Sequence, residues 1–313
     1  MKRVILTRLA WTLGILLGVS FVAFVLMRAL PGDFAIAATG AQSVAPEVLE
    51  GIRRQLGLDR PLIEQYVIWL GKALTGDFGV SFVTRQPVAG TVFDRFIVTF
   101  QLALIAAIMS IVMGSITGLA SARLRGATDW IVRMVNGVML AVPNYIVATL
   151  IVLLVGLYFP QFAILGYTPF LSDPVGNIAG LLLPALALSL AVSVTVSENI
   201  RAAVLEVANQ DFVMVARAKG LRRGAVLRDY LIRNALTPVV TATGLKVAAL
   251  LGGSILVETI FAIPGMGQYL YESINSRDYP VIQAIILLTA AIVVLVNMLV
   301  DIAYARIDAR VRL

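Results

Sequence analysis

The sequence contains no cysteine and no histidine, and it has few charged side chains. Without cysteine there is no disulfide, zinc–thiolate site or thiol chemistry, and without histidine the commonest general base and transition-metal ligand is missing. Charged residues make up 14% of the 313 residues and apolar residues 59%, whereas soluble domains have about 25% and about 45–50%. This composition excludes an ordinary soluble fold and indicates a membrane protein.

Long charge-poor runs predict the membrane-spanning helices, each of which needs about 20 mostly apolar residues. The run at 134–172 could hold two helices, but its second half is rich in aromatic residues and helix breakers, so we expect one helix followed by an interfacial loop. Pro143 and Pro184 free backbone carbonyls, so we expect kinks there. The sequence thus predicts an all-α, polytopic membrane protein with six transmembrane helices, at about 9–27, 97–121, 134–157, 178–199, 237–260 and 280–303.

Lysine and arginine predict the orientation of these helices. They gather at the N-terminus, around 123–133, in 201–233 and in the C-terminal tail, so the positive-inside rule places these parts, and both termini, in the cytoplasm. The same rule explains the net charge of +7 better than nucleic-acid binding does. The first run could be a cleaved signal peptide, but it is longer than an h-region and no small-x-small site follows at once, so we favour a retained anchor.

The first of two long polar segments, residues 31–95, lies outside in this orientation. Its apolar spacing predicts helices at 46–56 and 60–74. Two interpretations stay open: a lid packed on the outer mouth, or a surface for docking or gating.

The second polar segment, residues 201–233, is basic and too long for a simple connector. Ala216, Ala218 and Gly220 are small enough to let another backbone approach, and Gly220 can end a helix in the left-handed conformation. The segment is either a short helix that inserts into a groove of a partner or a basic amphipathic helix on anionic lipid.

Small and polar residues inside the predicted spans have two interpretations. Gly114 and Gly118 form a small-xxx-small pattern, which is typical of a helix-packing face. Hydroxyl side chains between 189 and 197 more often bond back to their own helix than line a path. Lys246 lies inside a predicted span, where a charge is costly. It faces a vestibule or a partner's carboxylate, or it lines the path and attracts an anionic group such as a peptide carboxylate.

Several motifs occur in the order found in one family of transporters. The chain resembles the permease subunits of bacterial ABC importers, specifically the B-type subunits with a long first loop in the dipeptide/oligopeptide/nickel family. The motifs are Leu56–Pro61, Gly76–Ser81, Ala216–Leu221 followed by Arg233–Leu236, Glu258–Gly267 and Arg277–Pro280.

The resemblance implies a type I ABC importer permease fold in the bacterial inner (cytoplasmic) membrane. Its parts would be an N-terminal transmembrane helix (1–30), an extracytoplasmic helical loop (31–95), a transmembrane domain (96–305) and a cytoplasmic tail (306–313). It also implies three kinds of partner: a second homologous permease subunit, two cytoplasmic ATPase subunits and an extracytoplasmic solute-binding protein. Gly-x-x-x-x-Gly-Lys-Ser/Thr is absent from the sequence, so we expect no cofactor and no enzyme activity in this chain, with ATP and Mg on the ATPase subunits.

The resemblance also assigns functional residues, none of them catalytic or metal-binding. The ATPase-coupling residues would be Val213, Met214, Ala216, Arg217, Ala218, Lys219, Gly220 and Leu221, and we expect the small ones to face the ATPase groove. The residues themselves, rather than the resemblance, give the candidates for the translocation pathway, which are Asn144, Ser193, Lys246 and Glu258.

The leading hypothesis is a permease subunit that forms half of the translocation pathway for di- or oligopeptides or a similar small solute. One alternative is a secondary transporter driven by an ion gradient, but the acidic residues Glu198, Glu258 and Asp301 fall at predicted span ends rather than at mid-membrane, and no repeat is visible. An intramembrane enzyme is a third alternative, but the sequence offers no histidine, no cysteine and no paired mid-membrane carboxylates as catalytic groups. The transported molecule could also be a nickel chelate or a glycoside instead of a peptide.

Overall fold

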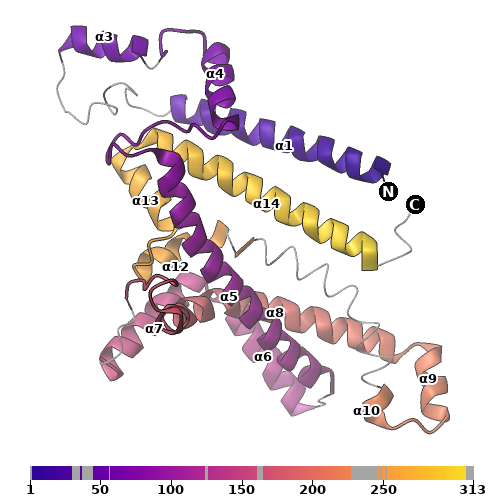
Figure 1. Cartoon of the computed structure of the whole chain (residues 1–313). Coiled ribbons are helices and arrows are strands. Elements are labelled where there is room, and N and C mark those ends of the chain that lie inside the picture. The colour runs from indigo at the N-terminus through magenta and orange to yellow at the C-terminus, as the bar shows by residue number, and fades with distance from the viewer. Residues whose placement is uncertain are drawn as a thin grey trace. The chain divides into compact units, whose positions relative to one another are not determined.

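The structure is a computed structural model that describes residues 2–29, 36, 45–55, 57–123, 126–160, 165–226, 246, 249–250 and 252–307. Within these ranges the regular structure is helical, apart from one isolated antiparallel bridge between Val80 and Pro87. Contacts divide the chain into two compact units, Met1–Thr99 with Pro264–Leu295 and Phe100–Ile263 with Val296–Leu313. The units are described separately below, with the labels of Figure 1.

The first unit contains two short helices from the polar segment 31–95. Its helices are α1 (Lys2–Ala29), α3 (Pro46–Gln55), α4 (Leu62–Leu74), the start of α5 (Val88–Arg123), α13 (Met266–Ser276) and most of α14 (Tyr279–Ile307). The helices predicted at 46–56 and 60–74 are confirmed by α3 and α4. Proline begins each of them, at position 46 within α3 and at position 61 as the N-cap of α4, where the missing N–H has no intrahelical partner to lose.

The core of the first unit forms where three helices meet. Val88 and Val92 of α5 pack with Met266 and Tyr269 of α13, and α14 adds Val281, Ala284 and Ile285. The backbone N–H of Met266 donates to Thr99 Oγ1 at 2.7 Å, which fixes the start of α13 on α5. This core supports the loop that leads into α5.

The second unit is built on the long helix α8. Its helices are α6 (Ala127–Ala141), α7 (Asn144–Tyr158), α8 (Pro174–Ala208), α9 (Asp211–Ala218), α10 (Arg223–Ala225) and α12 (Ile255–Ile260), with the remainder of α5 and the end of α14. Asp173 caps α8 by accepting the N–H of Gly176 at 2.9 Å. Pro184 lies inside α8, so the helix continues through this proline rather than ending there.

The small-xxx-small pattern is confirmed as a helix-packing face. A Cβ atom at Gly114 would lie 2.5 Å from Val196 Cβ and 2.6 Å from the Ser193 carbonyl oxygen, and one at Gly118 would lie 2.6 Å from the Ser197 carbonyl oxygen. The backbones of α5 and α8 therefore approach so closely that only glycine fits at both positions.

The predicted single helix at 134–157 is wrong. Two helices, α6 and α7, occupy this region and meet at an angle of 97°. Val142 precedes Pro143 and is extended (φ −85°, ψ 119°), because a residue before proline is disfavoured in the helical conformation. The proline therefore breaks the helix completely, where the sequence predicted only a kink.

The count of six spans is not confirmed. Among the described residues four helices are long and apolar enough to cross a membrane, in α1, α5, α8 and α14, and the bent pair α6–α7 makes a fifth if it is one span. The predicted span at 237–260 lies largely outside the described residues, as does the motif Arg233–Leu236, and α12 covers only the end of that span.

Replacing Gly114 with alanine tests the contact between α5 and α8. The added methyl group would force Val196 and the α8 backbone to move, so we expect a loss of about 1–3 kcal/mol of stability, typical of an overpacked core. Thermal unfolding of the detergent-solubilised protein measures this loss. The control is Gly90→Ala in the same helix, where a Cβ atom meets nothing within 4 Å; equal melting temperatures for the two variants would refute the close contact.

Candidate functional site

The predicted coupling segment forms a short helix beyond the end of α8. After α8 ends at Ala208, a turn at Asn209 and Gln210 leads into α9. The predicted end at Gly220 is confirmed, because Gly220 has φ +79° and the N–H of Leu221 bonds the Ala216 carbonyl oxygen at 3.4 Å. This is the bond of a Schellman motif, which needs a left-handed residue before its donor.

One face of α9 is buried against its own chain. Val213 and Ala216 belong to a core formed with Val196, Ile200 and Val204 of α8. Leu119 and Ala122, at the end of α5, pack on the same core. The expectation that Ala216 faces a partner's groove is therefore wrong, because Val213 and Ala216, three residues apart on one helix face, anchor α9 to α8.

The other face of α9 is exposed and mostly apolar. Ala218 and Gly220 are exposed, and their place against a partner's groove stays a prediction. The large apolar side chains on this side are Phe212, Met214, Val215 and Leu221. Lys219 is exposed too, whereas the side chain of Arg217 lies outside the described part of the chain. The residues predicted to couple to an ATPase thus divide into two that hold the helix in place and a larger set that is exposed.

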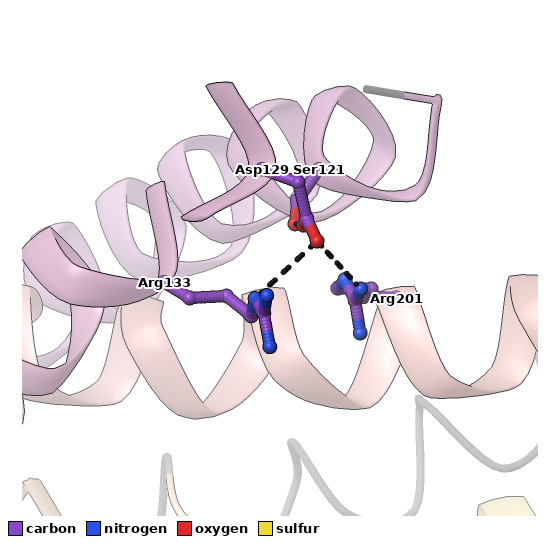
Figure 2. A network of polar contacts seen from close by, with 4 residues as sticks. All are labelled: Ser121, Asp129, Arg133 and Arg201. Carbon is purple, nitrogen blue, oxygen red and sulfur yellow. Dashed lines mark hydrogen bonds and ion pairs between the residues drawn. The ribbon is translucent and has the colours of Figure 1, made fainter. Parts of the chain in front are cut away.

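A polar network ties α5, α6 and α8 together (Figure 2). Asp129, in the first turn of α6, accepts a hydrogen bond from Ser121 Oγ of α5 at 3.0 Å. Its other carboxylate oxygen pairs with Arg201 Nη2 of α8 at 3.2 Å and with Arg133 Nε of α6 at 3.3 Å. A carboxylate near a helix N-terminus is favourable for the helix dipole. The charges of Asp129 and Arg201 thus fix the start of α6 to α8 beside the α9 anchor.

Of the pathway candidates, two are buried inside the second unit. Ser193 is buried, and its hydroxyl donates to the Leu190 carbonyl oxygen at 2.7 Å. This bond back to its own helix was predicted for the hydroxyl side chains between 189 and 197. Ser193 lies in the contact of α8 with α5. Glu258 is fully buried in α12 and accepts a hydrogen bond from Ser254 Oγ at 2.7 Å. The structure thus encloses both side chains within this chain.

The other two pathway candidates are at least partly accessible. Asn144 begins α7 and its amide reaches the Gly253 carbonyl oxygen at 3.5 Å. That contact joins the break between α6 and α7 to the residues before α12. Lys246 is exposed and lies in a stretch of which few residues are described, so its place in the path stays a prediction.

A buried polar site in the first unit was missed by the sequence analysis. Asp278, before α14, accepts hydrogen bonds from Ser81 Oγ at 2.5 Å and from the N–H of Phe82 at 3.0 Å. Ser81 Oγ in turn accepts from the N–H groups of Val83 and Thr84. Both side chains are buried. The signal was present, since Ser81 and Asp278 each belong to one of the quoted motifs, but nothing in the sequence paired them.

Tyr269 lies close to this site. Its burial, together with the negative charge of Asp278, raises the pKa of the Tyr269 hydroxyl, so this group is neutral at physiological pH. The guanidinium of Arg95 lies 5.4 Å from the centre of the Tyr269 ring, within cation–π range.

Comparison with known families covers almost the whole chain. The family "Binding-protein-dependent transport system inner membrane component" matches residues 110–313. Its N-terminal companion, "Binding-prot-dependent transport system membrane comp, N-term", matches residues 1–103. The chain belongs to the family of binding-protein-dependent transport system inner membrane components. It is a transport permease with several membrane-spanning helices, and the family is not one of enzymes.

Relatives of the permease extend over its full length. It is 39% identical to a putative peptide transport system permease protein of Brucella abortus (strain 2308), over 100% of this chain and 99% of that protein. It is 36% identical to the dipeptide transport system permease protein DppB of Lactococcus lactis, over 100% of both chains. The glutathione transport system permease protein GsiC of Escherichia coli (strain K12) is 35% identical, over 100% of this chain and 99% of that one.

Solved structures show the same fold. An amino acid ABC transporter with histidines matches with a TM-score of 0.53 and 18% identity, over 69% of this chain and 94% of that chain. The MetNI methionine ABC transporter, in an inward-facing conformation, matches with a TM-score of 0.53 and 16% identity, over 69% and 96%.

Removal of the Ser81 hydroxyl tests the buried site of the permease. Ser81→Ala leaves the Asp278 carboxylate buried with one fewer donor, so we expect a loss of about 1.5–3 kcal/mol, typical of a hydrogen bond to a charged group. Thermal unfolding measures this loss. Ser276→Ala removes an exposed hydroxyl of α13 in the same unit and should change stability by less than about 0.5 kcal/mol. A Ser81 variant as stable as this control would contradict the assignment.

Two arginines on one carboxylate give a matched test of the polar network. Arg201 is 29% exposed and Arg133 is 58% exposed, so Arg201→Gln should impair transport much more than Arg133→Gln, because solvent screens the exposed pair. Combining Arg201→Gln with Asp129→Asn should add little to either single change, since both break the same link. Uptake rates at equal amounts of membrane-inserted protein provide the measurement, and additive losses would show that the two residues act independently.

Proposed function

We propose that this permease forms half of the translocation pathway of an ATP-driven importer for short peptides or a similar small solute. The observation that carries this proposal is the full-length similarity to permeases named for the transport of peptides, dipeptides and glutathione. Glutathione is itself a tripeptide, so the three names share one chemical class. We propose the type I importer fold for the chain, with six spans, of which the fifth lies within 237–260.

ATP hydrolysis belongs to separate subunits in this proposal. The complete importer contains a second homologous permease, two cytoplasmic ATPases that hold ATP and Mg, and an extracytoplasmic binding protein. Both termini of this chain are cytoplasmic, as the distribution of lysine and arginine indicates. The exposed face of α9 is then the surface that contacts an ATPase.

The contacts around α9 support a rigid-body mechanism. Because Val213 and Ala216 are buried against α8, a force on the exposed face of α9 cannot turn this helix without disturbing a packed core. It moves the end of α8 instead, and with it the end of α5. Asp129 carries the displacement to α6. Such packed elements move as units between two states, and the break at Pro143 allows α6 to move relative to α7.

A lipid-bound α9 is the competing interpretation. Lys219 and Arg222 are exposed and suit an anionic membrane surface. However, an interfacial helix is held by its apolar face in the lipid, and α9 also buries part of its apolar surface against α8. Substitution at Ala218 separates the two interpretations.

Ala218→Trp should abolish uptake and uncouple ATP hydrolysis from cargo. Ala218 is exposed, so the indole disturbs no core of this chain and membrane insertion should be normal, but it blocks close approach of a partner. Ala216→Trp is the contrasting variant, because Ala216 is buried and overpacking there should lower stability by about 1–3 kcal/mol. Peptide uptake, ATPase activity and membrane content are measured for both. Normal uptake by Ala218→Trp, combined with damage from Arg222→Gln, would instead support the lipid-bound helix.

The energy source is tested in cells whose chromosomal gene for this permease is deleted and which carry the gene on a plasmid instead. Uptake of labelled di- and tripeptides should depend on the plasmid and stop when ATP is depleted while the ion gradient is intact. Continued uptake under these conditions would overturn the ABC assignment in favour of a secondary transporter. Identifying the small molecules that co-purify with the associated binding protein would distinguish peptide from a nickel chelate or a glycoside.

A further inference from the structure

The helix α4 is attached to the side of α1 by aromatic side chains. Tyr66 Oη and Ser20 Oγ share a hydrogen bond of 2.7 Å. The Tyr66 ring lies 5.2 Å from that of Phe21, and the Trp69 ring lies 5.5 Å from that of Phe24. Ala73 of α4 is buried on the same face. Figure 1 shows α4 standing against α1.

Next to this attached face, α4 carries an uncovered apolar stripe, formed by Ile63, Val67 and Leu74. These side chains are spaced four and seven residues apart, so they lie on one side of the helix. They are 71%, 60% and 80% exposed. Gln65 and Lys72 lie on the opposite side of α4 at 100° per residue, which makes the helix amphipathic with an apolar face much wider than its contact with α1.

The position of the contact on α1 indicates what covers the stripe. Tyr66 and Trp69 meet α1 between Leu17 and Phe24, and this part of α1 lies inside the candidate membrane span Trp11–Ala29. With 13 residues, α4 is too short to cross a bilayer itself. A helix held beside a membrane span with aliphatic side chains uncovered lies where lipid is present. Tyrosine and tryptophan are also the residues enriched at the membrane interface.

We propose that α4 is an interfacial helix whose stripe of Ile63, Val67 and Leu74 is immersed in the lipid beside α1. Helices of this kind bury their apolar face about 5–10 Å into the boundary between headgroups and acyl chains. Exposed apolar side chains of α1 itself, Leu17 and Phe21, border the contact, so the stripe continues a surface that already faces lipid. The stripe also has none of the aromatic or arginine side chains that are typical of protein-binding hot spots.

The neighbouring helix α3 has a different surface. It carries Glu47, Glu50, Arg53 and Arg54 within ten residues, and Glu50 pairs with Arg54 on its exposed surface. A helix with this charge density belongs in water. Anchoring of α4 in lipid therefore holds the outer segment at the membrane surface while α3 stays in the aqueous phase. This inference does not depend on the transported cargo.

The experiment uses the absence of cysteine from the chain, which allows single-site labelling without background. Val67→Cys and the matched control Lys72→Cys, on opposite sides of α4, are each labelled with an environment-sensitive fluorophore in the full-length protein. The protein is reconstituted in nanodiscs with and without brominated phosphatidylcholine. We expect the label at position 67 to be quenched at least about twofold more than the label at position 72, because only the apolar face enters the acyl-chain region.

Two results would overturn the proposal. Quenching at position 67 that is no stronger than at position 72 would show that the apolar face is not selectively immersed in lipid. Quenching at position 67 that disappears when the associated binding protein or a second permease is added would show that the stripe is a protein-docking surface. Folding is monitored independently by the melting temperature, and both variants should match the unsubstituted protein because both side chains are exposed.

Discussion

The close approach of α5 to α8 is the contact on which the second unit depends. Because Gly114 and Gly118 leave no side chain between the helices, the last turns of α5 lie directly on α8. Leu119 and Ala122 thereby join the core that holds α9. Ser121 reaches Asp129, which also pairs with Arg201. A wider spacing of the two backbones would separate all of these partners together.

This arrangement explains how a helix of eight residues is held firmly enough for the coupling role proposed for it. An isolated helix of that length is unstable in water, since about 12–15 residues are needed even for favourable sequences. Its inner face supplies the missing stability by packing on α8, and the left-handed Gly220 ends it at a defined place. The exposed residues of α9 are then carried on a rigid base. On the inner side of α9 the small Ala216 allows packing on α8, whereas on the outer side the small Ala218 leaves room for a partner to approach.

The sequence predicted the existence of most elements better than their continuity. Charge-free runs located α1, α5, α8 and α14 because lipid requires long apolar helices. The break between α6 and α7 was predicted only as a kink, since sequence alone does not show whether neighbouring groups restore the backbone bonds that Pro143 loses.

Side-chain partners were harder to predict than helices. Gly114 and Gly118 were correctly assigned to packing because their spacing matches one helix face. Ala216 was placed on the wrong side of α9, because a small residue suits a buried contact within the chain as well as a contact with a partner. The bond between Ser81 and Asp278 joins residues 197 positions apart, and no local periodicity can indicate such a pair.

That separation has a consequence for how the protein is made. Ser81 leaves the ribosome long before Asp278 is synthesised, and at about 5–20 residues per second the interval is about 10–40 s. During this time the loop that enters α5 lacks the carboxylate that accepts hydrogen bonds from its Ser81 hydroxyl and its Phe82 N–H. This loop therefore cannot complete its hydrogen bonds as translation proceeds and must wait for Asp278, which follows α13. Premature termination or slow insertion near the C-terminus would leave this distant loop unfinished and open to membrane proteases.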